Sequence, residues 1–150
     1  MKEKAVVIGL GNLYMRDDGL GIRVAQVLKE RDLGENVSVQ EHPEMDLTVI
    51  ENLQGASRVI VVDAVRGGKE PGTVSKYALA PRKGDLTQLP SLHSLALSDI
   101  LDLAMSSGML TCPVVIVGVE PKDDSLGVGL SPEVESALPK VIEAVIKELG

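Results

Sequence analysis

Aromatic side chains and cysteine are almost absent from this 150-residue chain. It has two tyrosines, Tyr14 and Tyr77, no Phe, no Trp and a single cysteine, Cys112. Without aromatic platforms, nucleic-acid bases have little to stack on, and one cysteine can form neither an intramolecular disulfide nor a Cys-rich zinc site. Cys112 precedes the apolar run Val114–Val117, which favours a buried, inert thiol. The core must therefore be built from Val, Leu, Ile, Ala and Met.

Basic residues are also in the minority: Lys and Arg number 15 against 22 Asp and Glu, which leaves a net charge of −7. Non-specific nucleic-acid binding needs basic surface, so we expect no nucleic-acid partner. No apolar run approaches the ~20 residues of a membrane span, and the first one, Ala5–Leu10, is too short for a signal peptide. With 44% apolar and 25% charged residues, the composition predicts one globular domain over residues 1–150. We expect it to be cytoplasmic and monomeric, without membrane insertion.

Three short apolar runs rich in Val and Ile are typical of strands buried on both faces of a mostly parallel sheet. They are Ala5–Leu10, Val59–Val62 and Val114–Val119. A weaker alternating stretch, Val37–Val39, predicts another strand nearer an edge. Thr73–Leu79 follows Val59–Val62 after too few residues for a parallel crossover, so we expect it to run antiparallel.

Apolar residues at helical spacing separate these runs. Apolar faces begin at Leu20, Leu47 and His93, and a last helix opens at Ser131, a favourable N-cap residue followed by proline. The pattern predicts an α/β fold: a three-layer sandwich whose mixed, mostly parallel sheet of about five strands has helices on both faces. Ligands of such folds bind at the carboxyl ends of the strands.

A glycine-rich segment, Gly9–Gly21, follows the first strand and superficially looks like a nucleotide-binding loop. The dinucleotide fingerprint GxGxxG fails because its third glycine falls on Tyr14, and no Gly-Lys-Ser/Thr completes a P-loop. What remains is an acidic pair, Asp17 and Asp18, at the start of a helix. Either these acids cap that helix, or they contribute to a site at the strand ends.

Two further residues lie where a site would form. Asp63 directly follows the apolar run Val59–Val62 at the end of that strand. Its carboxylate there either accepts loop amides or projects into a cleft. His93 lies on the apolar stripe of the third helix and is either a core histidine or a ligand. If Asp18, Asp63 and His93 converge, one nitrogen and two carboxylates would suit a divalent ion of borderline hardness. Such carboxylates would repel each other without a cation or proton between them.

Four spaced motifs cover nearly the whole chain. The first is Gly9–Gly21, which reads GxGNxxxxDDGxG; the others are Val-Asp-Ala at 62–64, His-Ser-Leu-Ala-Leu at 93–97, and Gly-Val-Glu-Pro at 118–121 ahead of a terminal Leu-Ser-Pro-Glu helix. In this order and at this chain length, they resemble the nickel–iron hydrogenase maturation endopeptidases. Because four motifs agree in register, the resemblance is far more specific than any one of them.

The resemblance implies a function. Members of that family remove a short C-terminal extension from the hydrogenase large-subunit precursor once nickel has been inserted. This chain is accordingly expected to be a hydrolase, an endopeptidase, whose partner is the nickel–iron hydrogenase large-subunit precursor. The family's metal-contacting and catalytic positions fall on Asp18, Asp63 and His93, the three residues already singled out.

The chemistry of the cleavage stays open at this point. No Ser-His-Asp or Cys-His arrangement is visible, so we expect an aspartic-type or a metal-dependent mechanism rather than an acyl-enzyme. The metal is either the nickel of the precursor or another divalent ion held by the enzyme. A loop expected at Glu41–Met45 departs from the Gly- and Thr-containing loop of many family members, which leaves the class of hydrogenase open. We interpret His42 as a loop residue without a catalytic role.

Two alternatives belong to other classes of protein. A phosphoacceptor receiver domain also has acids after the first strand and an aspartate at the end of the third. It would need Lys-Pro after the last core strand, where this chain has Glu120-Pro121-Lys122. A non-catalytic nickel-binding chaperone would use the same three site residues. A small phosphodonor would label the receiver, and a chaperone would bind nickel without cleaving a precursor.

Overall fold

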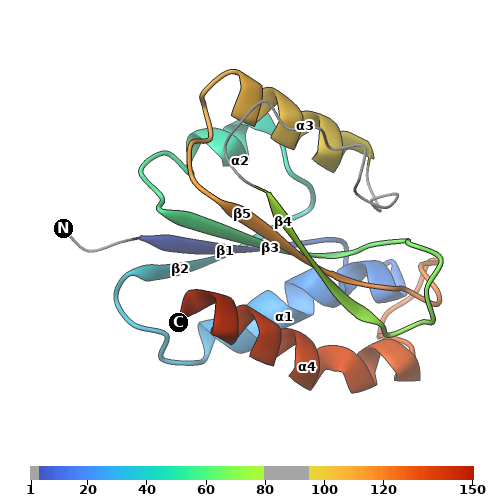
Figure 1. Cartoon of the computed structure of the whole chain (residues 1–150). Helices are drawn as coiled ribbons and strands as arrows, with labels where there is room; N and C mark the ends of the chain where they lie inside the picture. The colour runs from blue at the N-terminus through green and yellow to red at the C-terminus, as the bar shows by residue number, and fades with distance from the viewer. Residues whose placement is uncertain (1–3, 80–94) are drawn as a thin grey trace.

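The computed structural model describes residues 4–79 and 95–150, which form a central sheet between two layers of helices (Figure 1). The strands are β1 Ala5–Leu10, β2 Val37–His42, β3 Arg58–Ala64, β4 Val74–Leu79 and β5 Val114–Val119. The helices are the short 3-10 helix η1 Arg16–Gly19, α1 Leu20–Lys29, α2 Leu47–Glu51, α3 Leu95–Ser106 and α4 Pro132–Leu149. The expected three-layer α/β sandwich is confirmed.

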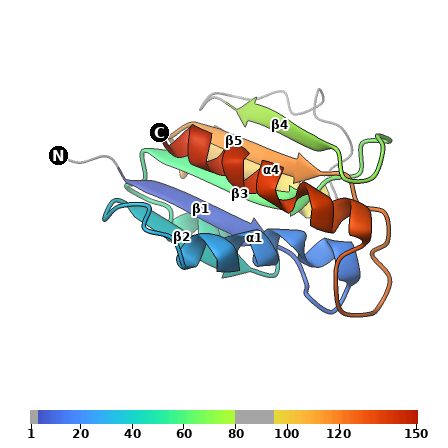
Figure 2. The ribbon, with the colours of Figure 1, turned by 90° about the horizontal axis from the view of Figure 1, so that it is seen from below.

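The five-stranded sheet has the order β2-β1-β3-β5-β4. β2, β1, β3 and β5 are parallel, while β4 pairs with β5 in the antiparallel sense. Figure 2 shows β2 and β4 at opposite edges of the sheet. The predictions of an antiparallel β4 and of β2 as an edge strand are therefore confirmed. A receiver domain has a fully parallel sheet, so the antiparallel β4 speaks against that alternative.

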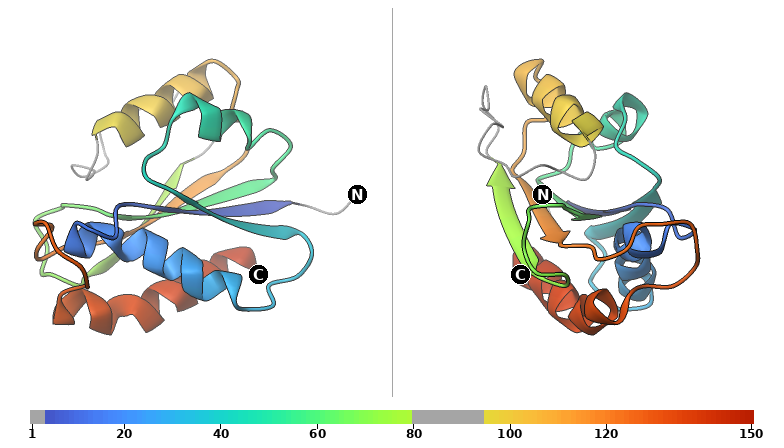
Figure 3. Two further views of the ribbon diagram at one scale, coloured as in Figure 1. Left: turned by 180° about the vertical axis from the view of Figure 1, so that it is seen from behind. Right: turned by 90° about the vertical axis from the view of Figure 1, so that its right-hand side faces the viewer.

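Two hydrophobic clusters fill the spaces between the layers. α1 and α4 cover one face of the sheet and α2 and α3 the other, as the two views of Figure 3 show. Ile8, Val61 and Ile116 point toward α2 and α3, whereas Val7 and Val117 point toward α1 and α4. The period of two follows from the pleat of a strand, and both faces of the inner strands are buried.

Cys112 lies in the cluster beneath α2 and α3, and burial raises the pKa of its thiol. The prediction of a buried cysteine is therefore confirmed, and a thiol that stays protonated is a poor nucleophile. Across residues 4–79 and 95–150, no helix is both long enough and apolar enough to cross a membrane.

Glycine lets α1 lie directly on the ends of two strands. A Cβ at Gly21 would be 2.4 Å from the carbonyl oxygens of both Leu10 and Val62, and one at Gly9 would be 2.1 Å from the Gly21 oxygen. No side chain fits in these spaces, so the backbone of α1 touches β1 and β3 where they end. η1, which immediately precedes α1, is thereby held at the carboxyl edge of the sheet.

Replacing Gly21 with alanine is therefore expected to lower the free energy of unfolding by about 2 kcal/mol, because the overpacked contact costs more than the gain in helix propensity. The corresponding fall in Tm is about 4 to 8 °C. Gln26→Ala, on the exposed side of the same helix, should change stability by less than about 0.5 kcal/mol. Thermal melting of the two variants checks this, and a wild-type Tm for Gly21→Ala would contradict it.

Candidate active site

Asp18 is held against the end of β1. β1 ends at Leu10, and the chain turns at Gly11, whose φ of +141° and close approach to the Asp18 carbonyl oxygen exclude a side chain. The Asn12 backbone N–H donates to the Asp18 carboxylate at 3.1 Å, and the Asn12 side-chain oxygen accepts from Tyr14 N–H at 2.9 Å. Asp18 is 9% exposed. Its carboxylate is thus fixed by the loop that follows β1.

Asp63 occupies the corresponding place at the end of β3. It is 2% exposed, and its carboxylate accepts the Ala64 backbone N–H at 2.8 Å. By the alternation of strand residues, it shares the sheet face of Val61, which lies under α2 and α3. η1, which carries Asp18, contacts β3, which carries Asp63. The structure therefore brings both predicted acids to the carboxyl edge of neighbouring parallel strands.

His93, the third predicted site residue, lies outside the described residues. α3 begins at Leu95, two positions later in the chain, and Figure 1 shows its first turn at the same end of the sheet as the carboxyl ends of the parallel strands. Among residues 4–79 and 95–150 no three His, Cys, Asp or Glu side chains form a group able to hold a metal ion. The convergence of Asp18, Asp63 and His93 stays a prediction.

Asp17, the neighbour of Asp18, has a different role. It is 0% exposed, and its carboxylate accepts four hydrogen bonds, from the backbone N–H groups of Lys122, Asp123 and Ser131 and from the Ser131 hydroxyl, at 2.7 to 2.9 Å. Burial acts to raise the pKa of Asp17, but these bonds outweigh it and hold the pKa below its ordinary value. Asp17 therefore fastens η1 to the segment between β5 and α4.

The interpretation of the acidic pair as a helix cap is wrong. The N-cap of α1 is Gly19, and neither η1 nor α1 has a side-chain cap bond. The pair faces away from its own helix because Asp18 bonds to the preceding loop and Asp17 bonds to a distant one. Ser131, in contrast, caps α4 as expected, since its side chain accepts from Val134 N–H.

The loops after β1 and β5 are joined along their backbones. Gly127 N–H donates to the Tyr14 oxygen at 2.8 Å and Arg16 N–H donates to the Gly127 oxygen at 3.0 Å. Arg16 adopts a φ of +45°, a conformation that costs energy for a residue with a side chain and often marks a functional site. The two loops therefore form one surface beside Asp18.

Glu120 is a further buried acid at this edge, which sequence reasoning placed only within a motif. It follows β5, is 8% exposed, and accepts the backbone N–H groups of Gly67 and Lys69 at 2.8 and 3.0 Å. These bonds anchor the loop between β3 and β4, directly after Asp63. Glu120 thus supports the strand end that carries the candidate acid.

The loop expected at Glu41–Met45 begins later than predicted. β2 extends through His42, paired in register with Leu10, so Glu41 and His42 are strand residues. The extension follows from β1, whose own last residues offer backbone partners up to Leu10. His42 Nε2 lies 2.9 Å from the Gln40 side-chain oxygen. The description of His42 as a loop residue is therefore wrong.

The fold and this edge define a class of protein. Buried carboxylates lie at the ends of adjacent parallel strands, the edge at which α/β folds bind their ligands, and the segment after β1 lacks a nucleotide-binding motif. The family model of the HycI hydrogenase maturation proteases matches residues 22–148. The chain belongs to this family of hydrogenase-processing endopeptidases.

Individual relatives agree with the family. The hydrogenase 2 maturation protease of Escherichia coli K12 is 26% identical over 148 residues, which cover 97% of this chain and 90% of that protein. The hydrogenase-maturating endopeptidase HybD from E. coli superposes with a TM-score of 0.84 at 25% identity, covering 97% of this chain and 91% of that one. The crystal structure of a hydrogenase 2 maturation peptidase from a Thaumarchaeota archaeon gives a TM-score of 0.76 at 31% identity, with 99% of each chain covered.

Proposed function

We propose that this protein removes the C-terminal extension of a nickel–iron hydrogenase large-subunit precursor after nickel has been inserted. Asp18, Asp63 and His93 contact the nickel that the precursor carries, and the scissile bond lies beside it. We expect the reaction to take place in the cytoplasm, with the enzyme acting as a monomer. The observation that carries the proposal is the placement of two buried acids, Asp18 and Asp63, at one edge of adjacent parallel strands.

The donor set suits nickel. Two carboxylate oxygens and one imidazole nitrogen are ligands for a divalent ion of borderline hardness, and three ligands leave coordination positions for groups of the precursor. Two carboxylates on neighbouring strand ends repel each other unless a cation or proton lies between them. A nickel-loaded precursor supplies that cation, whereas a nickel-free precursor does not. Nickel thus acts as a recognition element that reports completed insertion.

Hydrolysis adds water across the scissile peptide bond: the hydroxyl goes to the carbonyl carbon and a proton to the leaving amine. Two routes to this end fit the acids of the site. In the first, a carboxylate takes the proton of the attacking water as a general base. In the second, the water is activated by metal coordination. The two routes differ in whether nickel contributes only to recognition or also to the chemistry.

Incubation of the protein with nickel-loaded and nickel-free precursor tests the proposal. Mass spectrometry of the precursor should show loss of the C-terminal extension only in the nickel-loaded sample. A zinc-loaded precursor separates the two routes: a changed kcat at saturating precursor indicates that the metal takes part in the chemistry, whereas a change in KM alone indicates that it contributes only to recognition. Equal cleavage of loaded and nickel-free precursor would remove nickel recognition from the proposal.

The same experiment decides for or against a nickel chaperone. A chaperone would take up nickel from solution or from the precursor and leave the mass of the precursor unchanged. An endopeptidase produces two fragments whose masses sum to that of the precursor plus one water. Membership of the protease family favours the second result.

A further inference from the structure

β2 presents an open row of backbone hydrogen-bonding groups. Ala5 N–H donates to the Asn36 oxygen and Gly11 N–H donates to the His42 oxygen, so the even-numbered residues of this stretch face β1. Because successive residues of a strand direct their backbone groups to opposite sides, Val39 and Glu41 direct theirs away from β1. In the part of the chain that the structure describes, β2 pairs with β1 alone. Such an edge is a template for a further strand.

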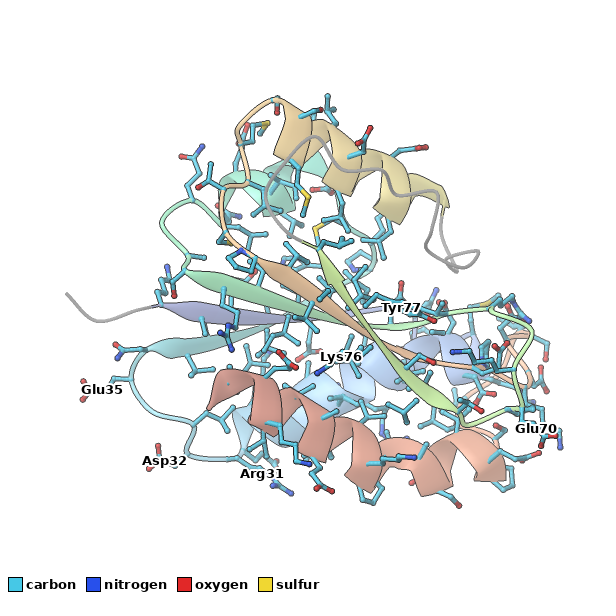
Figure 4. The ribbon with its side chains drawn as sticks, in the orientation of Figure 1. Arg31, Asp32, Glu35, Glu70, Lys76 and Tyr77 are labelled. Atoms are coloured by element: carbon cyan, nitrogen blue, oxygen red, sulfur yellow. The ribbon has the colours of Figure 1, made fainter. Side chains whose placement is uncertain are left out.

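Two hollows follow β2 on the side of α1. The first, of about 230 Å³, lies at its amino end and includes Val37 and Val39 in its lining. Figure 4 shows Arg31, Asp32 and Glu35 around the loop that enters β2, at the end of the sheet opposite the candidate site. A chain lying along β2 would run from this charged loop toward the carboxyl edge.

The second hollow, of about 370 Å³, lies at the carboxyl end of β2 and is mainly apolar. Leu13, Tyr14, Ile22 and Pro43 line it together with Asn12 and Glu41. Ile22 is 7% exposed and lines this hollow, so it contributes a largely buried apolar wall. This hollow adjoins the candidate site directly, since the Asn12 N–H in its wall is bonded to the Asp18 carboxylate.

We infer that the free edge of β2 binds the substrate polypeptide in an extended conformation, adding a strand to the sheet. The main chain of the substrate pairs with the outward N–H and C=O groups of Val39 and Glu41, and an apolar side chain of the substrate enters the hollow beside Ile22. Pairing along an edge strand supplies affinity, and a pocket for an alternate side chain supplies specificity. The inference rests on the proposed function, because it takes the occupant to be the precursor that is cleaved.

The opposite edge, β4, does not offer the same surface. The hollow between β4 and α4 is lined by charged side chains, including Lys76, Lys140 and Glu148. Lys76 pairs with Glu148 at 2.6 Å, and Figure 4 shows Lys76 on the strand next to Tyr77. β2 also carries an ion pair, between Lys29 and Glu41 at 2.6 Å, so charge alone does not distinguish the two edges. No residue of the loop that holds Asp18 lines the hollow at β4, whereas Asn12 lines the hollow at the carboxyl end of β2. The position of the hollows relative to Asp18 therefore favours β2 as the binding edge.

Val39→Pro tests the inference. Proline removes the outward N–H at a position where an edge strand tolerates it. The loss of one hydrogen bond made equally in the bound and transition states should raise KM for the nickel-loaded precursor about fivefold to tenfold, with kcat within about twofold. Val39→Ala keeps the N–H and loses only side-chain packing, so it measures the part of the effect that comes from the valine side chain, and its KM should rise less than that of Val39→Pro. Ala78→Pro, on an outward position of β4, should also leave KM unchanged.

Amide hydrogen exchange of β2 with its own sequence unchanged is the second test. It tests strand addition even if Val39→Pro does not fold. An Asp63→Asn variant is mixed with nickel-loaded precursor, exchange is quenched, and the protein is read by NMR. The amides of Val39 and Glu41 should exchange at least about tenfold more slowly in the complex, with the amide of Ala78 unchanged. Protection that depends on the concentration of the protein alone would mean that β2 pairs with a second copy, which would overturn the inference.

The two proposals fail in different ways. If the wild-type protein does not cleave the precursor, the proposed function fails. If it cleaves the precursor, while Val39→Pro has a wild-type KM and the Val39 and Glu41 amides gain no protection, the function stands and strand addition at β2 is wrong.

Discussion

Asp63→Asn is expected to reduce cleavage of the nickel-loaded precursor at least about 100-fold, the scale of losing a positioned acid–base group. Asparagine has nearly the same shape as aspartate, but it removes the negative charge and one oxygen that can bind nickel or accept a proton. It keeps one side-chain oxygen, which can still accept the Ala64 N–H now bonded at 2.8 Å. The fold should therefore survive, with Tm within about 4 °C of the wild type, or roughly 1 kcal/mol.

Asp18→Asn and His93→Ala should lose cleavage to a similar extent. Asparagine at position 18 can still accept the Asn12 N–H, so its loss of activity would reflect the missing charge. Asp102→Asn is the matched control, because it removes one negative charge from an exposed position of α3 and should cleave at the wild-type rate. C-terminal fragment formation and thermal melting are measured for all four variants. Near wild-type cleavage by Asp63→Asn or His93→Ala would exclude that residue from the mechanism.

The architecture of the sheet was largely predictable because its signals are local. Val-rich runs without charges can only be buried on both faces, and the short connection before Thr73 allows only an antiparallel return. These runs also predict where β1 and β3 end, and therefore the edge of the sheet at which Asp18 and Asp63 lie. Placement at that edge needed only the rule that parallel strands end together.

The different roles of Asp17, which bonds to the segment before α4, and of Asp18, which lies at the candidate site, could not be predicted. The role of Asp17 depends on contacts between segments more than 100 residues apart. An acidic pair before a helix has the same local pattern whether it caps that helix or reaches a distant loop. The end of β2 was misplaced for a related reason. Glu41 and His42 are poor strand residues by composition, and their pairing is imposed by β1, which continues to Leu10.

Asp17→Asn is expected to lower the free energy of unfolding by about 3 kcal/mol, a fall in Tm of about 6 to 12 °C. One Asp17 oxygen accepts the N–H groups of Lys122 and Asp123 and the Ser131 hydroxyl, and the other accepts the Ser131 N–H. Whichever oxygen becomes an amide nitrogen, its hydrogens meet at least one backbone donor, which leaves buried N–H groups without an acceptor. Because Asp17 positions η1, cleavage should also fall in the folded variant.

The pH dependence of the stability difference between wild type and Asp17→Asn separates the contribution of the Asp17 charge from that of its two acceptor oxygens. The folded-state pKa of Asp17 is lowered by its hydrogen bonds, so the carboxylate stabilises the fold at neutral pH. That contribution is lost as the pH falls below the ordinary aspartate value near ~3.9 toward the lowered folded value. The amide of the Asp17→Asn variant has no such titration, while the other acids are common to both proteins. The Tm gap between wild type and Asp17→Asn should therefore be widest at neutral pH and narrow below about pH 4. A gap of constant size across this range would show that the charge of Asp17 contributes nothing and that the gap comes from the second acceptor oxygen, which asparagine lacks.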